Sequence, residues 1–118
     1  MAKLNMIGPF DFTIDNVNRQ IAANKIGNYA LGYIDAKGAF RVLYVGRSDN
    51  DLNDRIKDHI GEYDNYKMFK FSYATSVKDA YEKECANWHD FGEDKLLKNK
   101  IHPDNPDKKQ YKCPVCGK

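Results

Sequence analysis

A phenol, a guanidinium and an imidazole occur within the stretch LYVGRSDNDLNDRIKDHI, residues 43–60. Tyr44 ends an apolar run, and Arg55 and His59 follow four residues apart, a spacing that puts both on one side of a helix. An arginine holds phosphoryl oxygens through its fixed fork of donors, and a tyrosine or histidine moves the proton of an attacking water. These residue types therefore indicate phosphodiester hydrolysis, in which charge on the phosphoryl oxygens is stabilised in the transition state.

A small set of helices and strands must position these side chains. The set is defined by apolar residues at helical spacing, by the expected N-caps Thr13 and Ser76, and by β-rich runs separated by a glycine-containing turn. The pattern predicts helices over residues 14–24, 51–61 and 77–90, a short helix in EDKLLKNK, and strands in NYALGYID, in FRVLYVG and over 68–75. We therefore expect an α+β fold with a mostly antiparallel three-stranded sheet flanked by helices.

Each strand of the expected hairpin carries a tripeptide that contains a tyrosine and a glycine. GNY at 27–29 begins the first strand and YVG at 44–46 ends the second, so Tyr29 and Tyr44 lie on neighbouring strands. Followed by LNDRIKDH, these tripeptides resemble the motifs of the GIY-YIG nuclease family, and the resemblance covers about residues 26–100. It implies a small GIY-YIG-like domain.

Two positions depart from the family's pattern or leave it open. Asn28 stands in the first motif where the family has an aliphatic residue, and Tyr33 in LGY is a second candidate for the tyrosine that we assign to Tyr29. We expect a single domain over residues 1–118, with an N-terminal helix before its core and a zinc-binding tail over 101–118.

The resemblance also implies a set of site residues. It gives Tyr29, Tyr44, Arg55, His59 and Glu84 as catalytic residues and Gly46 and Asn99 as substrate contacts, to which the basic residue Arg47, next to Gly46, is added. Glu84, four residues after Ala80, is the expected ligand of one Mg²⁺ ion, whereas Glu82 points roughly 200° away around the helix. A tyrosine whose pKa is lowered from ~10 by the cation and by Arg55 would take the proton of the attacking water, and His59 would orient or relay it.

The three cysteines suggest a second metal. Cys113 and Cys116 form a CPVC turn, which offers two thiolates to a tetrahedral zinc ion. Cys85 and His89 are four residues apart on one expected helix and would complete a structural site, with His102 as the competitor of His89. The alternative is that Cys85 is a small buried residue and CPVC a redox or disordered tail.

Composition bounds the class of protein. The chain has 118 residues, 42% hydrophobic residues and a net charge of only +2, which suits one folded domain and leaves DNA to be met by a local basic patch. The residues expected in that patch are Arg41, Arg47, Arg55, Lys57, Lys67 and Lys70. No apolar stretch approaches 18 residues and no signal-peptide core is present, so we expect a cytoplasmic protein without a membrane span.

Three functions are compatible with these patterns. The leading one is a Mg²⁺-dependent DNA endonuclease whose specificity comes from a protein partner or from self-association. The second is a catalytically inactive, zinc-stabilised module of the same fold that binds nucleic acid or protein. The third is a zinc-ribbon-like interaction protein whose tyrosines are core residues. Each tyrosine or charge alone is typical of packing or of a solvated surface, and only their joint occurrence in order favours the nuclease.

Overall fold

The computed structural model describes residues 4–99, 103 and 111–117. Four strands and four helices are formed by these described residues. Their bounds are β1 Ile7–Asp11, α1 Ile14–Gln20, β2 Gly27–Ile34, β3 Phe40–Ser48, α2 Leu52–Lys57, β4 Met68–Tyr73, α3 Val77–Asp90 and α4 Glu93–Leu96. The expected N-caps are confirmed, because Thr13 and Ser76 accept hydrogen bonds from the backbone of Asn16 and Asp79.

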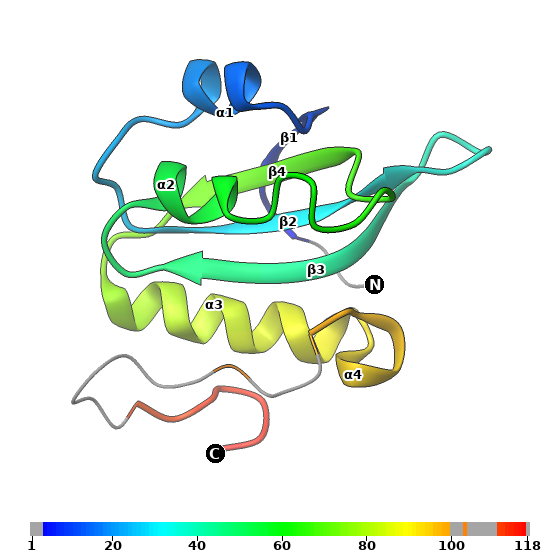
Figure 1. The fold of residues 1–118 in the computed structure, drawn as a ribbon. Coiled ribbons are helices and arrows are strands. Elements are labelled where there is room, and N and C mark those ends of the chain that lie inside the picture. Colours follow the sequence, from blue (N-terminus) through cyan, green and yellow to red (C-terminus); the bar gives the residue numbers. More distant parts are fainter. Residues whose placement is uncertain (1–3, 100–102, 104–110, 118) are drawn as a thin grey trace.

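The strands form one antiparallel sheet in the order β1-β4-β2-β3. Helices α1 and α2 cover one face of this sheet, and α3 runs along the other (Figure 1). The described part of the C-terminal tail lies beside α3, where Cys113 packs against Tyr81 and Cys85. The fold is therefore α+β, as expected, with the sheet as the middle of three layers (Figure 1).

The predicted three-stranded sheet was wrong, because β1 adds a fourth strand at an edge. Pro9 lies within β1 although proline has no N–H to give to a ladder. An edge strand tolerates it, and here the register with β4 shifts between Ile7 and Phe10, the stretch that contains Pro9. Phe10 then pairs with Phe69 and adds an aromatic side chain to the core.

Two helices are shorter than expected. Helix α1 ends at Gln20 rather than 24, because Ile21 turns into the extended conformation while its N–H still bonds to Val17. Helix α2 begins at the Asp51 cap and ends at Lys57 rather than 61. The following residues form successive turns, so His59 lies beyond the helix.

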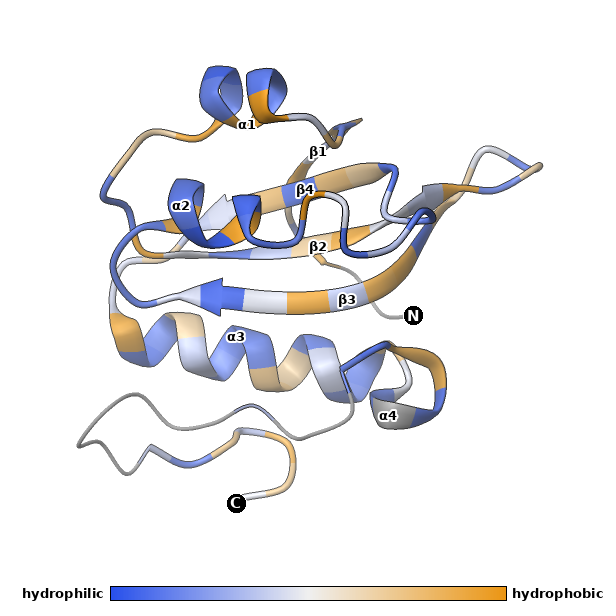
Figure 2. Cartoon of the chain, viewed as in Figure 1, coloured by the Kyte–Doolittle hydropathy of each residue, from blue (hydrophilic) through white to orange (hydrophobic). Residues whose placement is uncertain are grey.

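Both faces of the sheet are buried. Tyr29 and Leu31 of β2 face α1 and α2, where they pack with Phe69 and other aromatic residues. Alternate residues face α3, and Ala30 packs there with Trp88. Hydrophobic colour follows the strands in Figure 2, whereas the outer turns of α1 and α2 are mainly hydrophilic. Within the described ranges, no helix has the length and apolar character that crossing a bilayer requires.

Candidate functional site

The hairpin and the turn after α2 bring Tyr29, Tyr44 and His59 together. The Tyr29 side chain is fully buried, and its hydroxyl lies 2.7 Å from Nε2 of His59. The Tyr44 ring stacks beside that of Tyr29 at 6.1 Å between centroids and lies 4.5 Å from the His59 ring. Of the two candidate tyrosines, Tyr29 is therefore the one beside His59, whereas Tyr33 lies further along β2, opposite Arg41.

The glycines of the two tripeptides allow this packing. Gly46 lies opposite Tyr29 in the β2–β3 register, and a Cβ at position 46 would be 2.5 Å from the Tyr29 hydroxyl oxygen. At Gly27, a Cβ would be 2.8 Å from a methyl carbon of Leu52 on α2. Such distances are far shorter than van der Waals contact. Glycine is therefore required at these two positions because neighbouring atoms lie so close, and not because the backbone dihedrals are unusual. Gly46 thus has a packing role besides its expected contact with substrate.

Glu62 is a member of this cluster that sequence reasoning missed. Its Oε1 atom lies 3.1 Å from Nδ1 of His59, and its side chain is 44% exposed. An ionised carboxylate only accepts hydrogen bonds, so Nδ1 carries the hydrogen and Nε2 accepts one from the Tyr29 hydroxyl. The result is a carboxylate–imidazole–phenol chain. Its only sequence signal was the i, i+3 spacing of His59 and Glu62.

Arg55 approaches the same hydroxyl from α2. Its positive charge acts on Tyr29 and Tyr44, and its guanidinium lies 3.8 Å from the Asp58 carboxylate. About half of the Arg55 side chain is exposed, so part of its donor fork faces solvent. Arg55 can therefore hold an incoming anion beside the tyrosines.

Burial controls the acidity of both tyrosines. It raises the pKa of Tyr29 well above the ordinary value, and the charge of Tyr44 adds to this effect, while Arg55 lowers it in part. Burial also raises the pKa of Tyr44. Arg55 alone thus does not produce the lowered tyrosine pKa that was expected from the sequence. The Tyr29 hydroxyl keeps its proton at neutral pH.

Glu84 projects from α3 and is 9% exposed. It forms an ion pair with Arg47, whose guanidinium is also 2.9 Å from Asp49 and lies over the Tyr81 ring. Burial raises the pKa of Glu84 to about 7, against the lowering effect of Arg47. The charge of Glu84 helps to raise the pKa of Tyr29, so this carboxylate is electrostatically coupled to the tyrosine cluster.

The expected substrate contacts Arg47 and Asn99 both have partners within the protein. The Asn99 amide forms two hydrogen bonds with the backbone of Val45, at 2.9 and 2.6 Å, and thereby extends the edge of β3. Asn28, the departure from the family's motif, is buried and donates from Nδ2 to the carbonyl of Ala80 at 2.9 Å. These amides fix β2 and β3 relative to α3 and the segment after α4.

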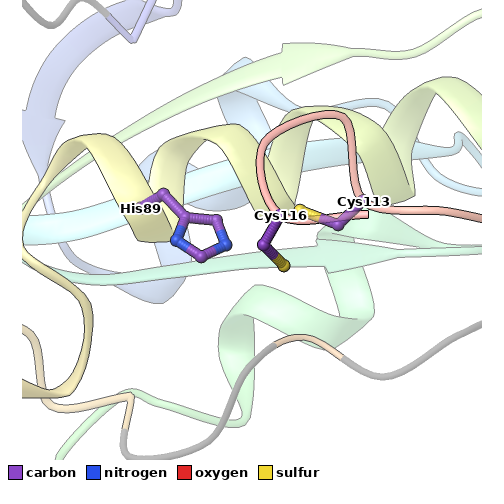
Figure 3. A group of neighbouring side chains, drawn as sticks. All are labelled: His89, Cys113 and Cys116. Carbon is purple, nitrogen blue, oxygen red and sulfur yellow. The ribbon is translucent and has the colours of Figure 1, made fainter. Parts of the chain in front are cut away.

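A separate cluster consists of His89, Cys113 and Cys116, whose ligand atoms all lie within 4.8 Å of one another (Figure 3). This group can hold a metal ion, and it contains three of the four expected zinc ligands. Cys85, an expected ligand, does not belong to it, because it is one helical turn before His89 and packs fully buried against Tyr81 and Cys113. The competitor His102 lies outside the described residues.

Comparisons with models of protein families, with curated proteins and with solved structures returned no match. The geometry of the tyrosine cluster, its coupling to Glu84 and the motifs that position both are therefore the basis for inferring a function.

Proposed function

We propose that the chain is a divalent-metal-dependent endonuclease that hydrolyses DNA phosphodiester bonds at a single site of the GIY-YIG type. The observation that carries the proposal is the environment of one hydroxyl. The Tyr29 hydroxyl is hydrogen-bonded to His59 and electrostatically coupled to Arg55 and Glu84. The resemblance of GNY and YVG to the family's motifs supports the same conclusion.

Glu84 fits the role of ligand for one Mg²⁺ ion. A carboxylate oxygen is the donor that this hard cation prefers, and one such ligand leaves the other coordination positions to water and phosphate. The bound ion would polarise the phosphate and stabilise the leaving oxygen. Because Glu84 is paired with Arg47, the carboxylate must turn from the guanidinium or be shared with it when the cation binds.

The chain's own residues would position the phosphate and move the proton. Arg55 would hold the phosphoryl oxygens through the exposed part of its fork. As the Tyr29 oxygen takes the proton of the attacking water, its own proton passes to Nε2 of His59, which Glu62 holds in the accepting tautomer. This route needs no tyrosinate before the reaction, in keeping with the raised pKa of Tyr29.

Further parts of the proposal concern the rest of the molecule. The expected basic residues would contact the DNA backbone without reading its sequence, so a protein partner or self-association would supply specificity. A structural zinc ion at His89, Cys113 and Cys116 would hold the tail and take no part in cleavage.

A second candidate function is a catalytically inactive module of the same fold that binds nucleic acid or protein. The ion pair between Glu84 and Arg47 favours it, because the guanidinium occupies the carboxylate that the cation would need. Both candidates keep the fold, and they differ in whether added Mg²⁺ produces cleavage.

Mg²⁺-dependent nicking of plasmid DNA tests the proposal. We expect the wild-type chain to nick in Mg²⁺ but not without it, and Glu84→Ala to lose the activity. Glu82→Ala is the matched control, since Glu82 lies two residues away on α3 and is partly exposed. A folded wild type that binds DNA without nicking it would favour the binding module. Wild-type rates in Glu84→Ala would contradict the site.

A further inference from the structure

The end of α3 and the tail offer three ligand atoms to one ion. His89 is in the last turn of α3. Cys113 and Cys116 lie on a turn that closes with a 2.9 Å hydrogen bond from the Gly117 amide to the Cys113 carbonyl. All three ligand atoms lie within 4.8 Å of one another, whereas ligand atoms around a tetrahedral zinc are roughly 3.5–3.8 Å apart. Small side-chain rotations would therefore close the site around zinc.

Glu93 fixes the histidine in the orientation that a metal requires. Its Oε2 atom is 2.5 Å from Nδ1 of His89, so Nδ1 donates to the carboxylate and Nε2 is the nitrogen for the metal. In Figure 3 a ring nitrogen of His89 points toward Cys116. Histidine ligands in zinc proteins almost always donate their other N–H in this way, often to a carboxylate.

The backbone places Glu93 for this contact. Gly92 has φ +106° and Glu93 has φ +56°, so the chain reverses directly after α3. A left-handed conformation is uncommon for a residue that is not glycine, and such residues cluster at functional sites. Here it returns the carboxylate of residue 93 to the imidazole four residues earlier.

Cys85 lies outside this arrangement. Its side chain is fully buried in a cluster with Tyr81 and Cys113, to which Tyr111 is packed. It contacts the buried cysteine of the pair but is one turn of α3 away from His89. If a zinc ion binds His89, Cys113 and Cys116, Cys85 therefore packs against the ligand Cys113 without binding the ion itself.

We infer that the zinc ion is bound by His89, Cys113 and Cys116, with Glu93 as the positioning carboxylate of His89 and with Cys85 excluded from the ligands. The fourth position would be taken by a group other than a thiolate. The inference rests on the proposed zinc ion but not on cleavage, because neither the ligands nor Glu93 belongs to the tyrosine cluster.

Cobalt substitution of the full chain tests the ligand set. Co²⁺ bound by thiolates absorbs in the near ultraviolet in proportion to their number, so the wild-type protein reports the count without any variant. We expect two thiolates and one ion per chain. Cys85→Ala should keep both the spectrum and the zinc content, and Cys113→Ser and Cys116→Ser should each lose them.

Glu93→Gln tests the positioning role. It should lower zinc affinity roughly 10–100-fold, the usual effect of losing such a partner, while the Co²⁺ spectrum stays that of two thiolates. Glu82→Gln, on the same region of the fold but away from the cluster, should leave affinity unchanged. A three-thiolate spectrum would overturn the ligand set, unchanged affinity in Glu93→Gln would overturn the positioning role, and a folded chain that binds neither metal would overturn the site. None of these outcomes depends on nicking.

Discussion

Tyr29 is held by groups from different elements, and each acts on its hydroxyl in its own way. His59, from the turn after α2, lies 2.7 Å away as an acceptor, and the positive charge of Arg55 on α2 acts to lower the pKa of the same hydroxyl. Gly46 of β3 leaves the space that the ring fills. A buried phenol with a raised pKa can still transfer a proton if an acceptor is already aligned, and His59 meets that condition.

We predict that Arg55→Ala abolishes nicking while the fold is kept. The side chain is 53% exposed, so its loss should change stability little, but it removes the donor fork from the phosphoryl oxygens. The expected loss of rate is about 10²- to 10³-fold, the effect of removing one transition-state donor. Plasmid nicking measures the rate, and circular dichroism verifies the fold.

Arg19→Ala is the matched control, because Arg19 lies exposed on α1 and does not belong to the basic residues expected to contact DNA. It should nick at close to the wild-type rate. Arg55→Lys retains the charge without the planar fork and should recover little activity. A folded Arg55→Ala protein with the wild-type rate would remove Arg55 from the site.

A second prediction concerns Glu62. Glu62→Gln should slow nicking by at least about 10-fold, because the amide no longer specifies which nitrogen of His59 carries the hydrogen. Nitrogen-15 NMR of the His59 side chain measures the tautomer directly, and we expect the Nδ1–H form to fall from its dominance in the wild type.

Asp64→Asn, an exposed change in the same loop, is the control and should alter neither property. An unchanged tautomer in Glu62→Gln would show that Glu62 does not position the imidazole, whatever the rate of nicking.

Among the residues of the site, chain order and spacing were enough to find the partners of Tyr29 on the hairpin and on α2. Glu62 was missed because its position depends on how the chain turns after Lys57, where the pattern predicted four more residues of helix. Cys85 was included because a spacing of four puts it and His89 on one helix face. That spacing says nothing of where the tail lies along the helix.

At the scale of elements, short-range signals located most strands and helices, including both ends of α3, but not the C-terminal ends of α1 and α2. Capping by Thr13 and Ser76 set the starts of α1 and α3, since the cap depends on residues next to it in sequence. Strand β1 was missed because its stability comes from pairing with β4, a contact between distant residues. Asn99 is similar, because only the fold brings its amide to Val45.

Gly46 offers a prediction about how β3 and β2 fit together. We predict that Gly46→Ala destabilises the fold by about 1–3 kcal/mol, the cost of overpacking a filled core, because the new Cβ would lie against the Tyr29 ring. Urea denaturation measures the free energy of unfolding. Nicking should fall as well, since the Tyr29 hydroxyl would move from His59.

A double-mutant cycle isolates the cause. In a Tyr29→Leu background the ring and its hydroxyl are absent, so Gly46→Ala should cost less than it does in the wild type. Equal costs in the two backgrounds would mean that Gly46 is required for something other than room for Tyr29.

At the scale of the whole molecule, the two faces of one sheet supply different parts of the proposed machinery. The tyrosine cluster lies under α1 and α2, whereas Glu84 comes from α3 on the other face, and Arg47 of β3 pairs with it. The sequence predicted an antiparallel α+β fold because strand and helix periodicities are local properties. The number of strands depends on long-range pairing and was not predictable in the same way.

The last prediction concerns Glu84 and the pH dependence of stability. Burial raises its pKa from 4.5 to about 7 in the folded chain, so folding favours the protonated carboxyl. The stability that this preference contributes is fully present below pH 4.5 and is lost as pH rises toward 7. Glu84→Gln keeps a neutral side chain at every pH. The free energy of unfolding of the wild type, relative to Glu84→Gln, should therefore fall by about 1–3 kcal/mol between pH 4.5 and 7.

Urea denaturation without added Mg²⁺ measures this difference. Glu82→Gln, at a partly exposed carboxylate of the same helix, should follow the wild type across the range. Added Mg²⁺ should reduce the fall for the wild type alone, because a cation at Glu84 favours its ionised form and binds only the folded site. A difference that rises with pH would mean that the Arg47 ion pair outweighs burial, and the carboxylate would then be ionised in the folded chain well below pH 7.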